Sequence, residues 1–110
     1  MIKSELITKL ANQFMDIPEK TIMDSANIIL DHMSEELSEG GRIEIRGFGS
    51  FCLHYRPPRN AHNPKTGEKV LTVAKYSPHF KPGKELRELV DEARKRGIPI
   101  QVEKRTDEDD

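Results

Sequence analysis

The first forty residues place apolar side chains at the spacing of amphipathic helices, in two stretches. The first stretch begins at Ile2 or Ser4 and ends near Met15, and its apolar positions are Leu6, Ile7, Leu10, Ala11 and Phe14. Pro18 suits the first position of a second helix, which ends at two glycines and has a stripe formed by Ile22, Ala26, Ile29, Leu30, Met33 and Leu37. The short join between the two stretches predicts a helical hairpin.

After the glycines at positions 40 and 41 the pattern changes from helical to alternating. Ile43 and Ile45 alternate with charged residues, and over residues 50–56 three further apolar side chains alternate with polar ones, namely Phe51, Leu53 and Tyr55. A turn is expected at residues 47–49, and a return strand from Val70 to about Tyr76. The sequence therefore predicts three antiparallel strands over the two helices, an α+β body with one sheet face open to a partner.

A third amphipathic helix follows in the C-terminal part. Pro82 and Gly83 open it, Gly97 ends it, and one of its faces carries Leu86, Leu89, Val90 and Ala93. We expect one domain over residues 1–96 and a polar, poorly ordered extension over residues 97–110. A short strand at residues 98–100 is the alternative for the start of this extension, but Pro99 disfavours it. A chain of this size buries little surface, so a second chain that shares the core is expected.

Residues 56–69 are too polar for a core, although extended sequence flanks them on both sides. They contain no large apolar side chain and three of the chain's seven prolines, at positions 57, 58 and 64. The order Asn63-Pro64-Lys65-Thr66-Gly67 is typical of a turn. We therefore expect a long hairpin arm over about residues 56–75, with this turn at its tip.

Charge is distributed unevenly along the chain, although the net charge is only −1. Residues 1–40 carry three basic and eight acidic side chains, a balance of −5. Residues 41–84 carry nine and two, a balance of +7, and residues 85–110 carry six and nine, a balance of −3. A positive middle between negative ends indicates a surface for a polyanion. The alternative is a solvated face on which the charges cluster by accident.

Other kinds of chemistry find no support in the sequence. Cys52 is the only cysteine, so no intrachain disulfide framework is expected and a reducing compartment fits. The four histidines, at positions 32, 54, 62 and 79, lie too far apart for a local metal motif. Without a catalytic constellation we expect no enzyme, no cofactor and no metal. No apolar run has the length of a signal peptide or a membrane span, so neither is expected.

The arm suits duplex DNA. Its cations gain affinity by releasing counterions from phosphates, and they are Arg56, Arg59, Lys65, Lys69 and Lys75. Pro64 is a rigid apolar wedge without a backbone N–H, and such wedges enter base steps from the minor groove and kink the duplex by roughly 20–90°. The bend would bring phosphates onto the body, where helix N-termini lie near Lys3, Lys81 and Lys84. An ordinary turn proline is the alternative interpretation of Pro64.

Several spaced motifs in a fixed order closely resemble the HU/integration host factor family of bacterial DNA-bending proteins. They are Lys3-Ser4-Glu5-Leu6-Ile7, the segment 41–51, Arg59 with the turn 63–67, and the segment 78–87. The resemblance covers residues 1–94. Within the family, the segment 42–46 and the triplet 54–56 are most similar to the beta-type subunit of integration host factor.

This resemblance implies an intertwined dimer whose two arms wrap DNA in the minor groove, with Pro64 intercalated and the duplex sharply bent. It implies a cytoplasmic protein of the bacterial nucleoid that acts in recombination, replication and transcription. The dimer would be a heterodimer with an alpha-type subunit or a homodimer. The resemblance further implies DNA contacts by His62 and Asn63 in the arm, and a sequence preference to which Arg42, Glu44 and Arg46 contribute. Arg46 would reach the minor groove and Glu44 would position an arginine; a solvated charge pair is the alternative.

Two features depart from the family, and two rival functions stay open. His62 stands where the beta-type subunit usually has arginine, so we expect weaker or more pH-sensitive arm contacts. The extension is longer than is usual in the family. Its acidic end, residues 107–110, is interpreted as inert disorder, and the alternative is that it competes with DNA for the basic face.

One rival is an HU-like homodimer with little sequence preference, which Glu44 disfavours. The other is a protein-interaction module, which the positive middle block disfavours.

Overall fold

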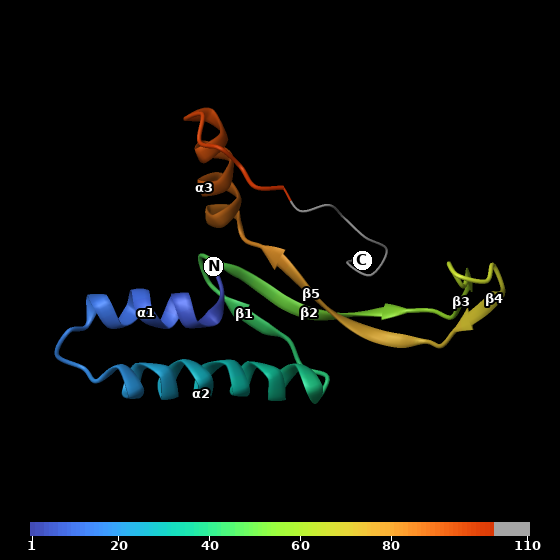
Figure 1. Cartoon of the computed structure of the whole chain (residues 1–110), viewed down its shortest axis with the longest axis horizontal. Coiled ribbons are helices and arrows are strands. Elements are labelled where there is room, and N and C mark those ends of the chain that lie inside the picture. The colour runs from blue at the N-terminus through green and yellow to red at the C-terminus, as the bar shows by residue number, and fades with distance from the viewer. Residues whose placement is uncertain (103–110) are drawn as a thin grey trace.

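The computed structural model describes residues 1–102 and begins with the predicted helical hairpin, α1 (Lys3–Gln13) and α2 (Glu19–Ser38) (Figure 1). α1 ends earlier than expected because Phe14, its C-cap, leaves the helical conformation with φ −123° and ψ 66°. Pro18, the predicted first helical residue, is instead the N-cap of α2, so the helix begins one residue later at Glu19. The glycine stop of α2 is confirmed, since Gly40 adopts φ +87°, a conformation that favours glycine.

The sheet is antiparallel and has the order β1-β2-β5. Its strands are β1 (Ile43–Ile45), β2 (Gly49–Arg56) and β5 (Lys75–Pro82). Residues 46–48 form the turn between β1 and β2, in which Gly47 adopts φ +84°. The predicted α+β fold class is confirmed: a helical hairpin, antiparallel strands with a hairpin arm, and a C-terminal helix.

The prediction of a return strand from Val70 to about Tyr76 is wrong in two respects. The strand is interrupted at residues 73–74, and its second part, β5, continues to Pro82. Pro78 and Pro82 both lie within β5, although proline cannot donate a ladder hydrogen bond. However, β5 pairs only with β2 within the described chain. Alternate N–H groups of such an edge strand face away from the ladder, so prolines fit there.

The arm is a separate two-stranded ladder of β3 (Arg59–His62) and β4 (Lys69–Thr72). It continues the long axis of β2 and β5 and projects from the body at the right of Figure 1. Residues 57–58 on one side and 73–74 on the other separate it from the sheet. The predicted arm is thus present, within the expected residues 56–75.

The last helix, α3 (Lys84–Lys95), projects from the sheet on the side away from the helical hairpin (Figure 1). Gly97 ends it as predicted. The Gly97 N–H donates to the carbonyl three residues back at 3.0 Å, and the Ile98 N–H donates to the Ala93 oxygen at 3.2 Å. These are the paired bonds of a Schellman motif. Residues 98–102 form no strand, and the acidic end of the extension lies outside the described residues.

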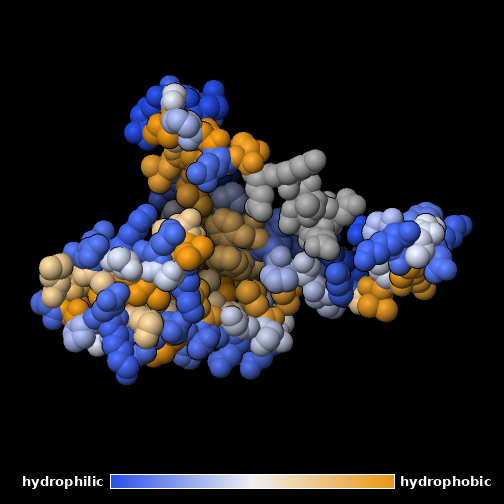
Figure 2. All heavy atoms as spheres, viewed as in Figure 1, coloured by the Kyte–Doolittle hydropathy of each residue, from blue (hydrophilic) through white to orange (hydrophobic). Residues whose placement is uncertain are grey.

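The core of the single chain is sparse. Within residues 1–102 the buried apolar side chains are Ile7 and Ile22, which are 6% and 9% exposed. The Phe80 ring packs 5.3 Å from Phe48 and 4.8 Å from Phe51, measured between centroids. Figure 2 shows apolar side chains at the surface of the helical hairpin, the sheet and α3. Large apolar side chains are exposed on all three helices and on every strand except β3, which is more open apolar surface than a monomer usually carries.

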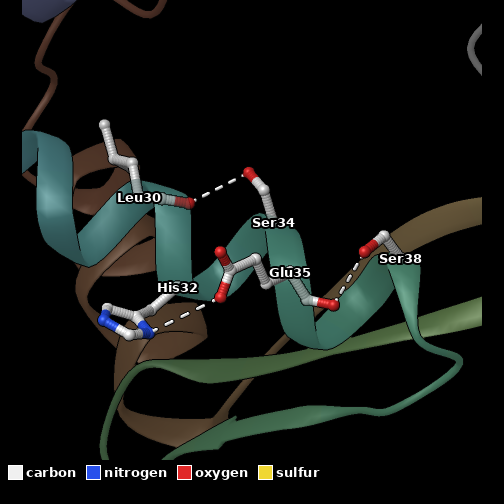
Figure 3. A network of polar contacts seen from close by, with 5 residues as sticks. All are labelled: Leu30, His32, Ser34, Glu35 and Ser38. Atoms are coloured by element: carbon white, nitrogen blue, oxygen red, sulfur yellow. Dashed lines mark hydrogen bonds and ion pairs between the residues drawn. The ribbon is translucent and has the colours of Figure 1, made fainter.

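Local side-chain contacts run along the second half of α2 (Figure 3). The Ser34 hydroxyl donates to the Leu30 oxygen at 2.9 Å, and the Ser38 hydroxyl donates to the Glu35 oxygen at 2.8 Å. His32 Nδ1 lies 3.9 Å from Glu35 Oε2. Such local bonds let hydroxyl side chains occupy a helix interior. No helix in residues 1–102 is long and apolar enough to cross a membrane.

Candidate nucleic-acid interface

The register of the sheet sorts its side chains onto two faces. Phe51 lies opposite Phe80, and Tyr55 lies opposite Tyr76, on the apolar face. The other face, here called the polar face, consists of Glu44, Ser50, Cys52, His54, Arg56, Lys75, Ser77, His79 and Lys81. Among these nine residues Glu44 is the only carboxylate and three are permanently cationic. The polar face is therefore suited to an anion.

The tip of the arm is held by a compact set of hydrogen bonds. The Asn63 N–H donates to the Glu68 oxygen at 2.8 Å, and the Gly67 N–H donates to the Asn63 oxygen at 2.7 Å. The Asn63 side-chain oxygen accepts the Lys65 N–H at 2.9 Å, an Asx turn. Pro64 lies inside this turn and is exposed. The predicted turn is confirmed, and it presents a proline on a fixed backbone.

Two permanent cations, Arg56 and Lys75, face each other at the base of the arm. Arg56 lies opposite Lys75 where β2 and β5 leave the body, and His62 lies opposite Lys69 near the tip. Like charges in directly opposed positions destabilise a ladder. An anion bound along the arm would remove that repulsion. The opposition of Arg56 and Lys75 thus supports the polyanionic ligand that the charge distribution along the chain indicates.

Arg59 is positioned by its backbone rather than by an ion pair. Its N–H donates to Thr72 Oγ1 at 3.0 Å, and the same hydroxyl donates to the Arg59 oxygen at 3.1 Å. These two bonds close the body-side end of the arm ladder, opposite the tip. The backbone that carries the Arg59 side chain is thereby held in the ladder.

The three residues expected to set sequence preference lie in and beside β1. Only Glu44 lies in β1; Arg42 precedes the strand and Arg46 belongs to the following turn. Arg42 Nη2 lies 3.7 Å from Glu44 Oε1, with side chains 63% and 77% exposed. An exposed pair of this kind contributes at most about 1 kcal/mol. Both groups remain accessible to a ligand at the first edge of the sheet.

The three body lysines lie near helix starts. Lys3 Nζ donates to Asn27 Oδ1 at 3.0 Å, from the first turn of α1 to α2. Lys81 lies on the polar face and is registered with Ser50. Lys84 begins α3, and its Nζ lies 3.9 Å from Glu88 Oε1. No side chain in the described chain caps the N-terminus of α1 or α3. Free backbone N–H groups at such positions attract phosphates.

One feature of the polar face escaped the sequence-based reasoning. His54 and His79 stack with ring centroids 4.2 Å apart and planes inclined by 16°. The alternation of β2 places His54 on the same face as Arg56, but the stack depends on the register of β5, which the sequence did not reveal. Within residues 1–102 no three potential metal-ligating side chains cluster.

Comparison with known proteins agrees with this geometry. Residues 1–91 match the family model described as "Bacterial DNA-binding protein". Integration host factor subunit beta of Escherichia coli is 61% identical over 88 residues, which are 80% of this chain and 94% of that protein. The corresponding protein of Shigella boydii serotype 18 has the same identity and coverage.

Solved structures give the same assignment. The Anabaena HU–DNA cocrystal structure superposes with a TM-score of 0.75 at 34% identity, covering 82% of this chain and 97% of the other. HU from Thermotoga maritima superposes with a TM-score of 0.55 at 31% identity, covering 82% and 98%. The predicted family is confirmed, and its members are DNA-binding proteins rather than enzymes. The chain belongs to the bacterial DNA-binding protein family of HU and integration host factor, as an architectural DNA-binding protein of the integration host factor beta type.

Proposed function

We propose that this chain bends duplex DNA as one subunit of an intertwined dimer, with its arm in the minor groove and Pro64 inserted into a base step. The observation that carries the proposal is the exposed Pro64 on the hydrogen-bonded tip of a cationic arm. Unstacking one step costs a few kcal/mol. Phosphates drawn onto the arm and body by the bend offset this cost through counterion release.

The proposed contacts follow the path from the arm to the body. In the arm they are Arg56, Arg59, His62, Asn63, Pro64, Lys65, Lys69 and Lys75. In the body they are Lys3, Arg42, Glu44, Arg46, Lys81 and Lys84. Sequence preference arises partly from the deformability of the DNA and partly from the β1 hairpin, where Arg46 enters the minor groove and Glu44 orients an arginine. We assign this function to residues 1–96.

The apolar surface of the chain supports a partner subunit. The facing sides of α1 and α2 leave an open groove of about 400 Å³, lined mainly by Leu6, Leu10, Phe14, Ile17, Ile22, Ala26, Ile29 and Leu30. On α3, Leu89 and Val90 are 63% and 59% exposed. Burying such surface is worth roughly 25 cal/mol per Å². A second subunit that fills the groove and covers α3 supplies the missing core.

The partner is an alpha-type subunit of integration host factor, because the relatives at 61% identity are named as its beta subunit. The rival is a homodimer of the HU kind, which the fold similarity to HU supports. Native mass spectrometry of the complex co-purified from the source organism separates the two by mass. The proposed cellular site is the nucleoid, with roles in recombination, transcription and replication.

Ligase-mediated circularisation tests the bending. A duplex of about 100 base pairs, shorter than the persistence length of about 150, should form covalent circles only with the dimer present. Duplex binding without circles contradicts bending. Salt dependence separates this function from the rival protein-interaction module. DNA affinity should fall by about 0.9 log units per log unit of salt for each phosphate neutralised. The rival predicts no such steep fall.

A further inference from the structure

The two stacked histidines lie on the polar face of the sheet, between the base of the arm and the β1 side of the body. His54 on β2 and His79 on β5 have centroids 4.2 Å apart and planes at 16°. They stack diagonally across the ladder, since His54 is registered with Ser77 and His79 with Cys52. Both imidazoles are exposed. The pair is therefore an accessible feature near the middle of the polar face.

The charged groups around this pair are mainly cationic. Along β2, the next polar-face neighbours of His54 are Cys52 and Arg56. On β5 the neighbouring cations are Lys75 and Lys81. On β1, Glu44 is registered with Ser50, which is itself registered with Lys81. Glu44, the one carboxylate of this face, is thus opposite neither ring: Ser50 and Lys81 are its neighbours across the sheet. Two stacked imidazolium rings in this setting would repel each other and their neighbours.

We propose that His54 and His79 form a DNA-phosphate contact that takes up a proton when the duplex binds. The inference rests on the proposed DNA binding and deepens it. A phosphate beside the stack supplies the negative charge that the polar face lacks, and a protonated imidazole donates from both ring nitrogens where a neutral one donates from one. The pair lies between Arg56 and Lys81, so a duplex that contacts both cations passes over it.

The sign of the pH dependence follows from linkage. Phosphate stabilises the protonated ring, so the proton is held more tightly in the complex than in the free protein. At low pH, where the ring is protonated even in the free protein, the added DNA affinity is fully present. As pH rises and the ring loses its proton in the complex as well, the added affinity disappears. Histidine titrates near neutrality. Uptake of one proton therefore lowers DNA affinity by up to about tenfold per pH unit above neutrality.

The competing interpretation is a structural stack. Two neutral rings opposed across a ladder stabilise the pairing of β2 and β5 without contacting DNA. In that case DNA binding involves no proton exchange at these positions, and replacing the rings changes the stability of the sheet alone.

Titration calorimetry distinguishes the two. The full chain carrying His62→Gln, which removes the histidine of the arm, is titrated with duplex at about pH 7 in HEPES and in Tris, whose ionisation enthalpies differ. The contact predicts a buffer-dependent heat that corresponds to about 0.5–1 proton taken up per chain. Adding His54→Gln and His79→Gln should abolish that dependence. Adding His32→Gln, which alters a ring beside Glu35 on α2 (Figure 3), should leave it unchanged.

Each outcome bears on a separate claim. Equal heats in both buffers overturn the proton-linked contact without any need for the double variant. A buffer dependence that survives loss of both rings assigns the proton elsewhere and also overturns it. If the original chain shows no duplex binding by fluorescence anisotropy at low salt, the proposed DNA binding itself fails.

Discussion

Removing two cations from the arm should flatten the salt dependence of DNA binding. Lys65 lies in the tip turn and Lys69 begins β4 opposite His62; both are exposed. Within residues 1–102 neither side chain belongs to an ion pair. The turn uses the backbone N–H of Lys65, not its ammonium group. The Lys65→Ala/Lys69→Ala variant therefore removes charge and leaves the hydrogen bonds of the arm in place.

The magnitude follows from the number of cations. Each phosphate neutralised on B-DNA contributes about 0.9 to the slope of log K against log salt. Two lysines per arm should lower the slope by about 1.8. Between about 50 and 200 mM salt the original protein should then lose about twelvefold more affinity than the variant, for each arm of this sequence in the dimer.

Fluorescence anisotropy of a labelled duplex at five or six salt concentrations measures the slope directly. The matched control is Lys9→Ala/Lys95→Ala, which removes the same charge from α1 and α3 instead of the arm. The control should keep the original slope to within about half a unit. The reasoning is refuted if the arm variant keeps the full slope, or if the control lowers it as much.

Three further predictions concern single side chains. Arg46→Ala, in the turn after β1, should weaken the binding free energy by about 1–3 kcal/mol at a preferred site and by much less on random duplex, as is usual when a base contact is lost. Competition binding measures the ratio of the two affinities. Equal losses on both duplexes argue against a role of Arg46 in sequence preference. His62→Arg should tighten binding at about pH 8, where histidine is mostly neutral; indistinguishable titration curves would show that the ring does not contact DNA. Asn63→Ala removes the acceptor of the Lys65 N–H at the tip, worth about 1 kcal/mol. Amide hydrogen exchange at Lys65 should speed up about fivefold, and an unchanged rate would mean that the side-chain bond does not hold the turn.

The parts of the fold that depend on local sequence were predictable. The helical hairpin follows from two apolar stripes with a proline-marked join, and the tip turn follows from Asn63-Pro64 and Gly67. The arm follows from a polar, proline-containing segment between alternating stretches. In each case neighbouring residues decide the conformation, so the pattern along the chain is sufficient.

The parts that depend on pairing between distant residues were not predictable. Pro78 lies inside β5, where its position at a sheet edge makes its missing N–H harmless. The stack of His54 on His79 and the opposition of Arg56 and Lys75 require the register of β2 with β5. One residue of slip would move these side chains to the other face. Register is a property of the assembled sheet, and the signal available in the sequence was only the alternation of β2.

The bend angle of the Pro64→Ala complex tests the central claim most directly. Energy transfer between the two ends of a duplex is measured at saturating protein, so that any loss of affinity does not enter the result. Pro58→Ala, at an exposed proline outside the strands at the base of the arm, is the matched control. A wedge at Pro64 predicts a clearly smaller bend for Pro64→Ala and an unchanged bend for Pro58→Ala. A Pro64→Ala complex bent as sharply as the original would contradict it.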